Sequence, residues 1–319
     1  MRYTIRHVTR FTYDHPISES VMEARMQPRT EGGQRCLRFG LSTLPASRVM
    51  LYQDHDGNIV HHFNIPGRHG MLTVTAEALV ECDPLPPVPD ALDLDAWPRV
   101  DAIAQSGEFW EYLAPSTFAQ PTPLLQEFAR AIGLTRYRDP LTALRNAATE
   151  IYTRLEYSPL STRVDSPIDD ALSSQRGVCQ DFAHIFIALA RFVGVPCRYV
   201  SGYLFHQEGA PDRSRDGATH AWAEVLLPDW GWVGVDPTNN LLAAERHVRV
   251  AIGRDYADVP PTRGVYKGST VVQSELGVSV RIGPVYQEVG GESLPLLPWI
   301  SREAPVPAAE PDFDQQQQQ

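Results

Sequence analysis

The stretch GVCQDFAHIFIALARFVGVPCRYVSGY, residues 177–203, decides the fold because it reads as a turn, an apolar helix and a strand in succession. Apolar side chains recur at helical spacing as far as Val193, so one face of this helix is directed to a core. Gly194 and Pro196 then end the helix, and a strand follows them. Cys179 therefore stands in the first turn of the helix, with its thiol facing another layer of the protein.

A second stretch, HAWAEVLLPDWGWVGVDPTN at residues 220–239, predicts two strands that turn about Pro228. His220 opens the first strand, and Asp236 closes the second. In the register that this turn implies, His220 faces Asp236 directly, and facing side chains lie about 5 Å apart. Because a slip of one residue would put them on opposite faces, the pairing depends on this register. A carboxylate in this place can orient the imidazole and hold its tautomer.

The sequence leaves four interpretations of Cys179: a small buried hydrophobe, half of a disulfide, a zinc ligand or a nucleophile. A cytosolic chain of this size does not readily keep disulfides. A zinc site would have to combine Cys179 with His184, Cys197 and His206, at spacings that match no familiar pattern. A nucleophile is favoured because a helix N-terminus stabilises a thiolate and offers N–H groups to an oxyanion. His220 is the better base, since His184 points away from the thiol on the same helix.

The rest of the chain divides by its periodicity. Residues 1–85 alternate apolar and polar side chains and contain an Asp-Gly hairpin, which predicts an N-terminal antiparallel β domain. Residues 86–98 are rich in proline and acidic residues and are typical of a linker. We expect a core over residues 99–290 with further strands at its end, and a disordered tail over residues 303–319. The core includes expected helices at 139–155 and at 167–175, the second begun by Pro167 and capped by Ser166.

The composition excludes several classes of protein. Of the 319 residues, 43% are apolar and 21% are charged, as in ordinary globular proteins. The net charge of −11 argues against a nucleic-acid partner and gives no support for binding to an anionic membrane. No apolar run reaches the length of a membrane span, and the N-terminus lacks the apolar segment of a signal peptide. We therefore expect a cytoplasmic protein, and the oligomeric state stays open. Thiol chemistry at Cys179 requires neither a metal nor another cofactor.

The two motifs closely resemble the core of the bacterial transglutaminase-like proteins, relatives of papain-type thiol proteases. The likeness covers about residues 140–265, and GRDYADVPPTRGVYKG at 253–268 resembles the segment that follows this core. The first 85 residues resemble the N-terminal domain of bacterial members. The resemblance implies an α+β fold, with the nucleophile on a central helix that packs on an antiparallel sheet. It also implies that Cys179 is the nucleophile, His220 the general base and Asp236 the orienting carboxylate.

The function implied by this resemblance is amide cleavage or transfer through a thioester, with a peptide or protein as substrate. Water as acceptor gives a peptidase or amidase; an amine gives a transglutaminase; a non-catalytic binding module on the same fold is the remaining alternative. The family likeness further suggests Tyr157 as a second oxyanion donor beside the Cys179 amide. Gln180 and Asp181 lie beside the nucleophile, where they can tune it or bind substrate, and Trp222 is a further candidate for substrate binding. The acidic net charge favours a basic or neutral substrate.

Overall fold

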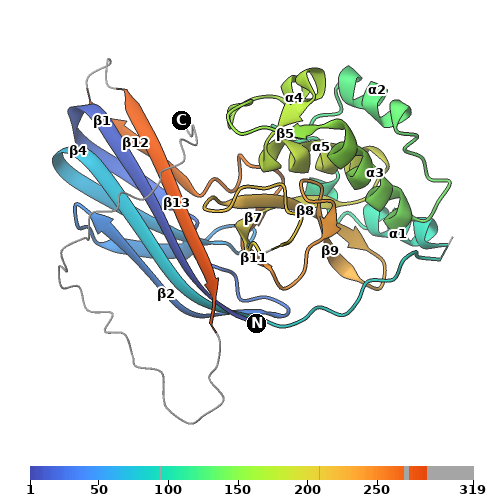
Figure 1. Cartoon of the computed structure of the whole chain (residues 1–319), viewed down its shortest axis with the longest axis horizontal. Coiled ribbons are helices and arrows are strands. Elements are labelled where there is room, and N and C mark those ends of the chain that lie inside the picture. Colours follow the sequence, from blue (N-terminus) through green and yellow to red (C-terminus); the bar gives the residue numbers. More distant parts are fainter. Residues whose placement is uncertain (94, 208, 269–272, 286–319) are drawn as a thin grey trace, which may run out of the picture.

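The computed structural model describes residues 1–93, 95–207, 209–268 and 273–285. It is a mixed α/β structure in which a long twisted sheet lies beside a second part made of helices and a smaller sheet (Figure 1). The expected α+β architecture is confirmed. The tail predicted at residues 303–319 and the end of the predicted core lie outside the described residues.

The long sheet is antiparallel and contains strands from both ends of the chain. Its strands are β1 (Arg2–Ala24), β2 (Gln34–Leu44), β3 (Val49–Gln53), β4 (Ile59–Cys82), β12 (Thr262–Lys267) and β13 (Ser274–Pro284). The alternation near the N-terminus buries Tyr3 and Ile5, as a strand with one wet face requires. Strands β12 and β13 pair with β1 and so belong to this sheet, whereas the sequence analysis assigns their residues to the core over 99–290.

The connection between the two parts ends earlier than the composition suggests. Helix α1 (Ala96–Gln105) begins inside the stretch predicted as a linker over residues 86–98. Trp97 explains the difference, because its side chain is buried and its Nε1 donates a hydrogen bond to the Arg138 carbonyl at 2.6 Å. Pro98 lies in the first turn, where proline is compatible with a helix.

The second part combines a five-stranded antiparallel sheet with helices that lie above it in Figure 1. Its strands run in the order β10 (Leu241–Leu242), β9 (Gly231–Asp236), β8 (His220–Leu227), β7 (Cys197–Leu204) and β11 (His247–Gly253). The helices are α1, a 3-10 turn η1 (Trp110–Tyr112), α2 (Pro123–Ala131), α3 (Pro140–Arg154), α4 (Ile168–Ser174) and α5 (Cys179–Phe192). None of the helices in the described residues is long and apolar enough to span a membrane.

Helix α5 is the centre of this part, because every side chain from Gln180 to Arg191 is buried. It packs against β7 and β8, with α2, α3 and α4 on its other sides. Helix α3 agrees with the prediction and is capped by Asp139, which accepts from the Thr142 N–H. Helix α4 also forms, but the expected cap is wrong. The Ser166 hydroxyl accepts instead from the Arg163 N–H in the preceding loop, and Pro167 stands one residue before the helix.

The hairpin of β8 and β9 forms in a register that differs from the expected one. Leu227 pairs with Gly231, so the turn is centred on Asp229, which adopts a left-handed conformation with φ of 66°. Ala223 pairs with Val235, so one residue further along this register Trp222, and not His220, lies level with Asp236. The shift is an even number of residues, so His220 and Asp236 remain on the same face.

Candidate active site

The loop before α5 is shaped by its backbone contacts. A two-stranded parallel ladder, β5 (Glu156–Tyr157) with β6 (Arg176–Gly177), places Tyr157 beside Gly177. A Cβ on Gly177 would lie 2.9 Å from the Asp181 carboxylate, so only glycine fits there without rearrangement. Cys179 follows as the first residue of α5 and is half-buried, with its thiol free. The N–H groups of this first helical turn have no intrahelical partner.

Asp181 supports this loop from below and does not line the cleft that contains Cys179. Its Oδ2 accepts from the Val178 N–H at 2.8 Å and from the Thr162 hydroxyl at 2.5 Å. Burial raises the pKa of Asp181 to about 6, although these two hydrogen bonds oppose the rise. The structure therefore gives Asp181 a positioning contact at the helix start, which fits the tuning alternative, and places it away from the cleft that a substrate would occupy.

His220 and Asp236 form a buried pair at the end of the hairpin. The His220 Nε2 lies 2.8 Å from the Asp236 Oδ2, and both side chains are almost completely buried. Burial alone would lower the pKa of His220, but the charge and hydrogen bond of Asp236, with a smaller contribution from Cys179, raise it to about 10. Burial would raise the pKa of Asp236, and the two neighbouring histidines lower it instead.

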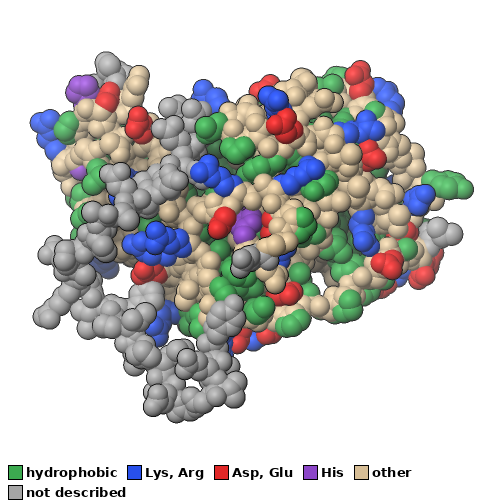
Figure 2. Space-filling view, in the orientation of Figure 1, with side chains coloured by type: hydrophobic (Ala, Val, Ile, Leu, Met, Phe, Trp, Pro, Cys, Tyr) green, Lys and Arg blue, Asp and Glu red, His purple; other side chains and the backbone are tan. Residues whose placement is uncertain are grey.

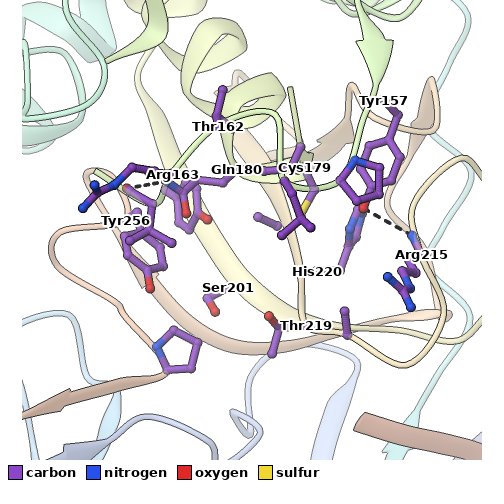
Figure 3. A pocket seen from close by; sticks show the side chains of 18 residues that line it. Tyr157, Thr162, Arg163, Cys179, Gln180, Ser201, Arg215, Thr219, His220 and Tyr256 are labelled. Carbon is purple, nitrogen blue, oxygen red and sulfur yellow. Dashed lines mark hydrogen bonds between the residues drawn. The ribbon is translucent and has the colours of Figure 1, made fainter. Parts of the chain in front are cut away.

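The other ring nitrogen of His220 is available to a reaction partner. Its Nδ1 is buried and forms no hydrogen bond of ordinary geometry with the described residues. Cys179 and His220 both line one cleft and lie close together in it (Figure 3). The arrangement can therefore pass a proton between the thiol and Nδ1 while Nε2 stays on the carboxylate.

Asp236 has further partners that the sequence analysis missed. Its Oδ1 accepts from the backbone N–H groups of Thr238 and Asn239, and its Oδ2 accepts from the Asn239 side-chain amide at 2.8 Å. His247, at the start of β11, places its Nε2 3.2 Å from the same Oδ2. Its Nδ1 accepts from the Ala244 N–H, so Nε2 carries the proton. A histidine opening the apolar strand HVRVAIG was the available signal for this contact.

These side chains are also the one described group whose atoms could together hold a metal ion. Suitable atoms of His220, Asp236 and His247 lie within 4.8 Å of one another. The same atoms are joined by hydrogen bonds, which the ring protons of neutral or charged imidazoles explain without a metal.

The four residues of the zinc interpretation are not brought together among the residues that the structure covers. His184 is buried and accepts from the Tyr256 N–H, and burial lowers its pKa to about 3. Cys197 is buried in the core, and burial raises its pKa to about 12. His206 lies beside Asp212.

The cleft around Cys179 encloses about 1040 Å³, including its open mouth. Tyr157 and Cys179 project into it from one side, above His220 (Figure 3). The phenol oxygen of Tyr157 accepts from the Arg215 N–H at 3.4 Å. Gln180 also lines the cleft, while its amide donates to the Val164 carbonyl at 2.7 Å. Both residues thus line the cleft beside Cys179, as the sequence analysis expects.

Trp222 is placed elsewhere. Its side chain is fully buried, stacks behind the His220 ring with centroids 6.0 Å apart, and is absent from the residues that line the cleft. It packs against Gly202 and Gly234, whose lack of side chains makes room for the indole. The proposed contact of Trp222 with substrate is therefore wrong, and the indole acts as a support for His220.

Comparison with known proteins agrees with this fold and arrangement. Residues 127–237 match the family described as the transglutaminase-like superfamily. Residues 3–81 match the bacterial transglutaminase-like N-terminal region. An uncharacterized protein of Mycobacterium leprae is 34% identical over 282 residues, covering 88% of this chain and 98% of the relative. The chain belongs to the bacterial transglutaminase-like proteins.

Other relatives are similar over different lengths. An uncharacterized protein of Mycobacterium tuberculosis is 34% identical over 89% of this chain and 93% of its own length. A protein-glutamine gamma-glutamyltransferase of Pseudomonas aeruginosa is 29% identical over 34% of this chain and 18% of its own length. The crystal structure named "Putative Cysteine Protease from Cytophaga hutchinsonii" has a TM-score of 0.67, with 21% identity over 91% of this chain and 93% of that one. This last likeness supports the fold.

Proposed function

We propose that the protein is a cysteine-dependent hydrolase that cleaves peptide or isopeptide amides through a thioester. In this proposal Cys179 is the nucleophile, His220 the general base and acid, and Asp236 the group that orients the imidazole. The observation that carries the proposal is the buried 2.8 Å contact between His220 Nε2 and Asp236, which leaves Nδ1 facing the cleft that Cys179 lines.

The chemistry follows from these positions. The Cys179 proton passes to His220 Nδ1, and the sulfur attacks the amide carbonyl carbon. The Cys179 N–H, at a helix start, and the Tyr157 hydroxyl are the proposed donors to the resulting oxyanion. The imidazolium then protonates the leaving amine as the C–N bond breaks, which leaves a thioester. Water attacks the thioester, His220 accepts its proton, and the thiol and a carboxylic acid are released.

Amine transfer is the second candidate, because a partly similar Pseudomonas aeruginosa protein is named a protein-glutamine gamma-glutamyltransferase. An amine that reaches the thioester before water does would give a new amide by the same steps. Hydrolysis is preferred because the mouth of the cleft is open to solvent, so water can reach the thioester without a second binding site. Adding a primary amine to any turnover assay separates the two, since it diverts product from the acid to the amide.

Thiol reactivity tests the proposal before a substrate is known. Iodoacetamide at about pH 6 should modify Cys179 quickly, because a thiol paired with a base reacts where an ordinary thiol is mostly protonated. Cys36, also half-buried, is the control within the same chain, since burial raises the pKa of its thiol. Peptide mass spectrometry reports both sites in one sample.

The variant His220→Ala should slow modification of Cys179 at this pH by at least tenfold and leave Cys36 unchanged. Equal rates at Cys179 in both proteins would instead favour a non-catalytic binding module. Once a substrate is found, Cys179→Ala should abolish its turnover.

A further inference from the structure

The charged side chains in the cleft have the opposite sign to the chain as a whole. Besides His220, Arg163 and Arg215 are the charged residues among the 18 that line it, and no carboxylate does so. The chain nevertheless carries a net charge of −11. Acidic and basic side chains are interspersed over the visible face of the molecule (Figure 2), so the net charge alone does not indicate the charge of any one site.

The two arginines lie at opposite ends of the cleft, with Cys179 and His220 between them (Figure 3). Arg163 is on the loop between β5 and α4, and Arg215 is on the segment before β8. Both residues are exposed, so a ligand can reach them. Arg163 donates through Nε to Asp165 at 3.1 Å, and its guanidinium forms no other hydrogen bond with the described residues.

The remaining cleft surface is neutral. Gln180, Ser201 and Thr219 supply uncharged hydrogen-bonding groups, while Leu160 and Pro261 supply apolar ones. Such groups suit a peptide backbone and short side chains, whereas a guanidinium is shaped to bind a carboxylate through two parallel hydrogen bonds. A lysine or arginine of a substrate would meet like charge at either end and no carboxylate in the cleft.

We propose that the substrate is acidic and that it carries a carboxylate close to the scissile amide, bound by Arg163 or Arg215. Peptides rich in glutamate or aspartate, and amides of acidic amino acids, are the compounds that fit. This inference rests on the proposed function for the identity of the reacting thiol. It replaces the expectation of a basic or neutral substrate that the net charge suggested.

The test compares two reagents that differ mainly in charge. Iodoacetate is an anion and iodoacetamide is neutral, and both alkylate the thiolate of Cys179. The ratio of their rates cancels differences in the thiolate fraction, so it reports the charge that the reagent meets. Arg163→Gln and Arg215→Gln should each lower this ratio two- to fivefold, as expected for an exposed charge worth up to about 1 kcal/mol. Added salt should lower the wild-type ratio towards that of the variants.

Arg145→Gln is the matched control, because Arg145 is an exposed arginine of α3 that does not line the cleft. Its ratio should stay that of the wild type. As a second readout, N-acetylglutamate should protect Cys179 from iodoacetamide better than N-acetylglutamine, and the double arginine variant should lose this difference.

Unchanged ratios in both cleft variants, together with equal protection by the two compounds, would overturn the proposal. This result is distinct from a failure of the proposed function. If Cys179 is not activated, it reacts slowly at about pH 6 whatever the reagent, and the ratio is then measured at about pH 9, where ordinary thiols ionise.

Discussion

Replacing Asp236 by asparagine tests the central geometry of the site. Asparagine can still accept from the Thr238 and Asn239 N–H groups, so the turn is retained. Its side-chain amide can turn an N–H towards His220 Nε2, which then has to act as acceptor. The imidazole proton moves to Nδ1, on the side of Cys179, and the ring can no longer take the thiol proton.

The size of the effect follows from the pKa of His220. Its rise from 6.5 to about 10 corresponds to about 5 kcal/mol of stabilisation of the imidazolium, at 1.36 kcal/mol for each pKa unit. Burial alone lowers this pKa, so the partners of His220 supply the whole rise, and Asp236 contributes more than Cys179. We therefore expect Asp236→Asn to reduce alkylation of Cys179 at about pH 6 by roughly 10²–10³-fold.

Two measurements check this prediction. The first is the alkylation rate, with circular dichroism to confirm that the variant is folded. The second is urea unfolding between about pH 6.5 and pH 10. A histidine with a raised folded-state pKa stabilises the protein fully below 6.5, and this stabilisation is lost as the pH rises through about 10. The wild type should show the loss, and the variant should show little of it. A folded variant with less than a tenfold fall in rate and the wild-type pH dependence would refute the reasoning.

Substitutions at three further positions probe the surroundings of the site. His247→Leu removes one of the donors to Asp236, so it should lower the free energy of unfolding in urea by about 1.5–3 kcal/mol and slow alkylation of Cys179 at about pH 6. His247→Gln keeps a donor and should recover part of both losses. Equal losses in the two variants would show that the hydrogen bond contributes to neither property. Asp181 has a raised folded-state pKa of about 6, so the free energy of unfolding of the wild type should rise by up to about 3 kcal/mol as the pH falls from 6 towards 4. Asp181→Asn should flatten this dependence of stability on pH. An unaltered pH dependence in the variant would contradict the raised pKa of Asp181. Gly202→Ala would place a Cβ 2.6 Å from the Trp222 ring and should destabilise the protein by about 1–3 kcal/mol; unfolding at the wild-type urea midpoint would show that the sheet relaxes freely.

The sequence was most informative where local periodicity and burial agree. Helix α5 and strands β7 and β8 begin and end within a residue of their expected limits, because apolar spacing and the stop at Gly194 and Pro196 act locally. Cys179 and His220 could be named for the same reason, since they begin α5 and β8, and Asp236 could be named because it ends the next strand, β9. The proximity of Cys179 and His220 in one cleft depends on the packing of α5 on the sheet, which the family likeness implied.

Features set by non-local packing were missed or misplaced. The hairpin turn is centred on Asp229 because that residue adopts a left-handed conformation, which the Pro-Asp dipeptide alone does not determine. Strand β11 pairs with β7 and not with β9, so the histidine that opens HVRVAIG is visible in the sequence, but its approach to Asp236 is set by the sheet order. Trp222 shares the predicted face with His220, but its indole is buried and does not line the cleft. The space that holds the indole is made by Gly202 and Gly234 on the two neighbouring strands, which the local sequence around Trp222 does not reveal.

The arrangement around Asp236 also argues that this network serves reactivity beyond stability. A buried carboxylate must be compensated by donors, and Thr238, Asn239 and His247 already supply four hydrogen bonds to it. The fifth comes from His220, whose second nitrogen is not engaged by the carboxylate network and whose pKa is raised further by its interaction with Cys179. The half-buried thiol at the start of α5 lies close to His220 in the cleft (Figure 3). A carboxylate network that fixes Nε2 of the imidazole, while the other side of the ring interacts with the thiol, is the arrangement expected of a base held ready for Cys179.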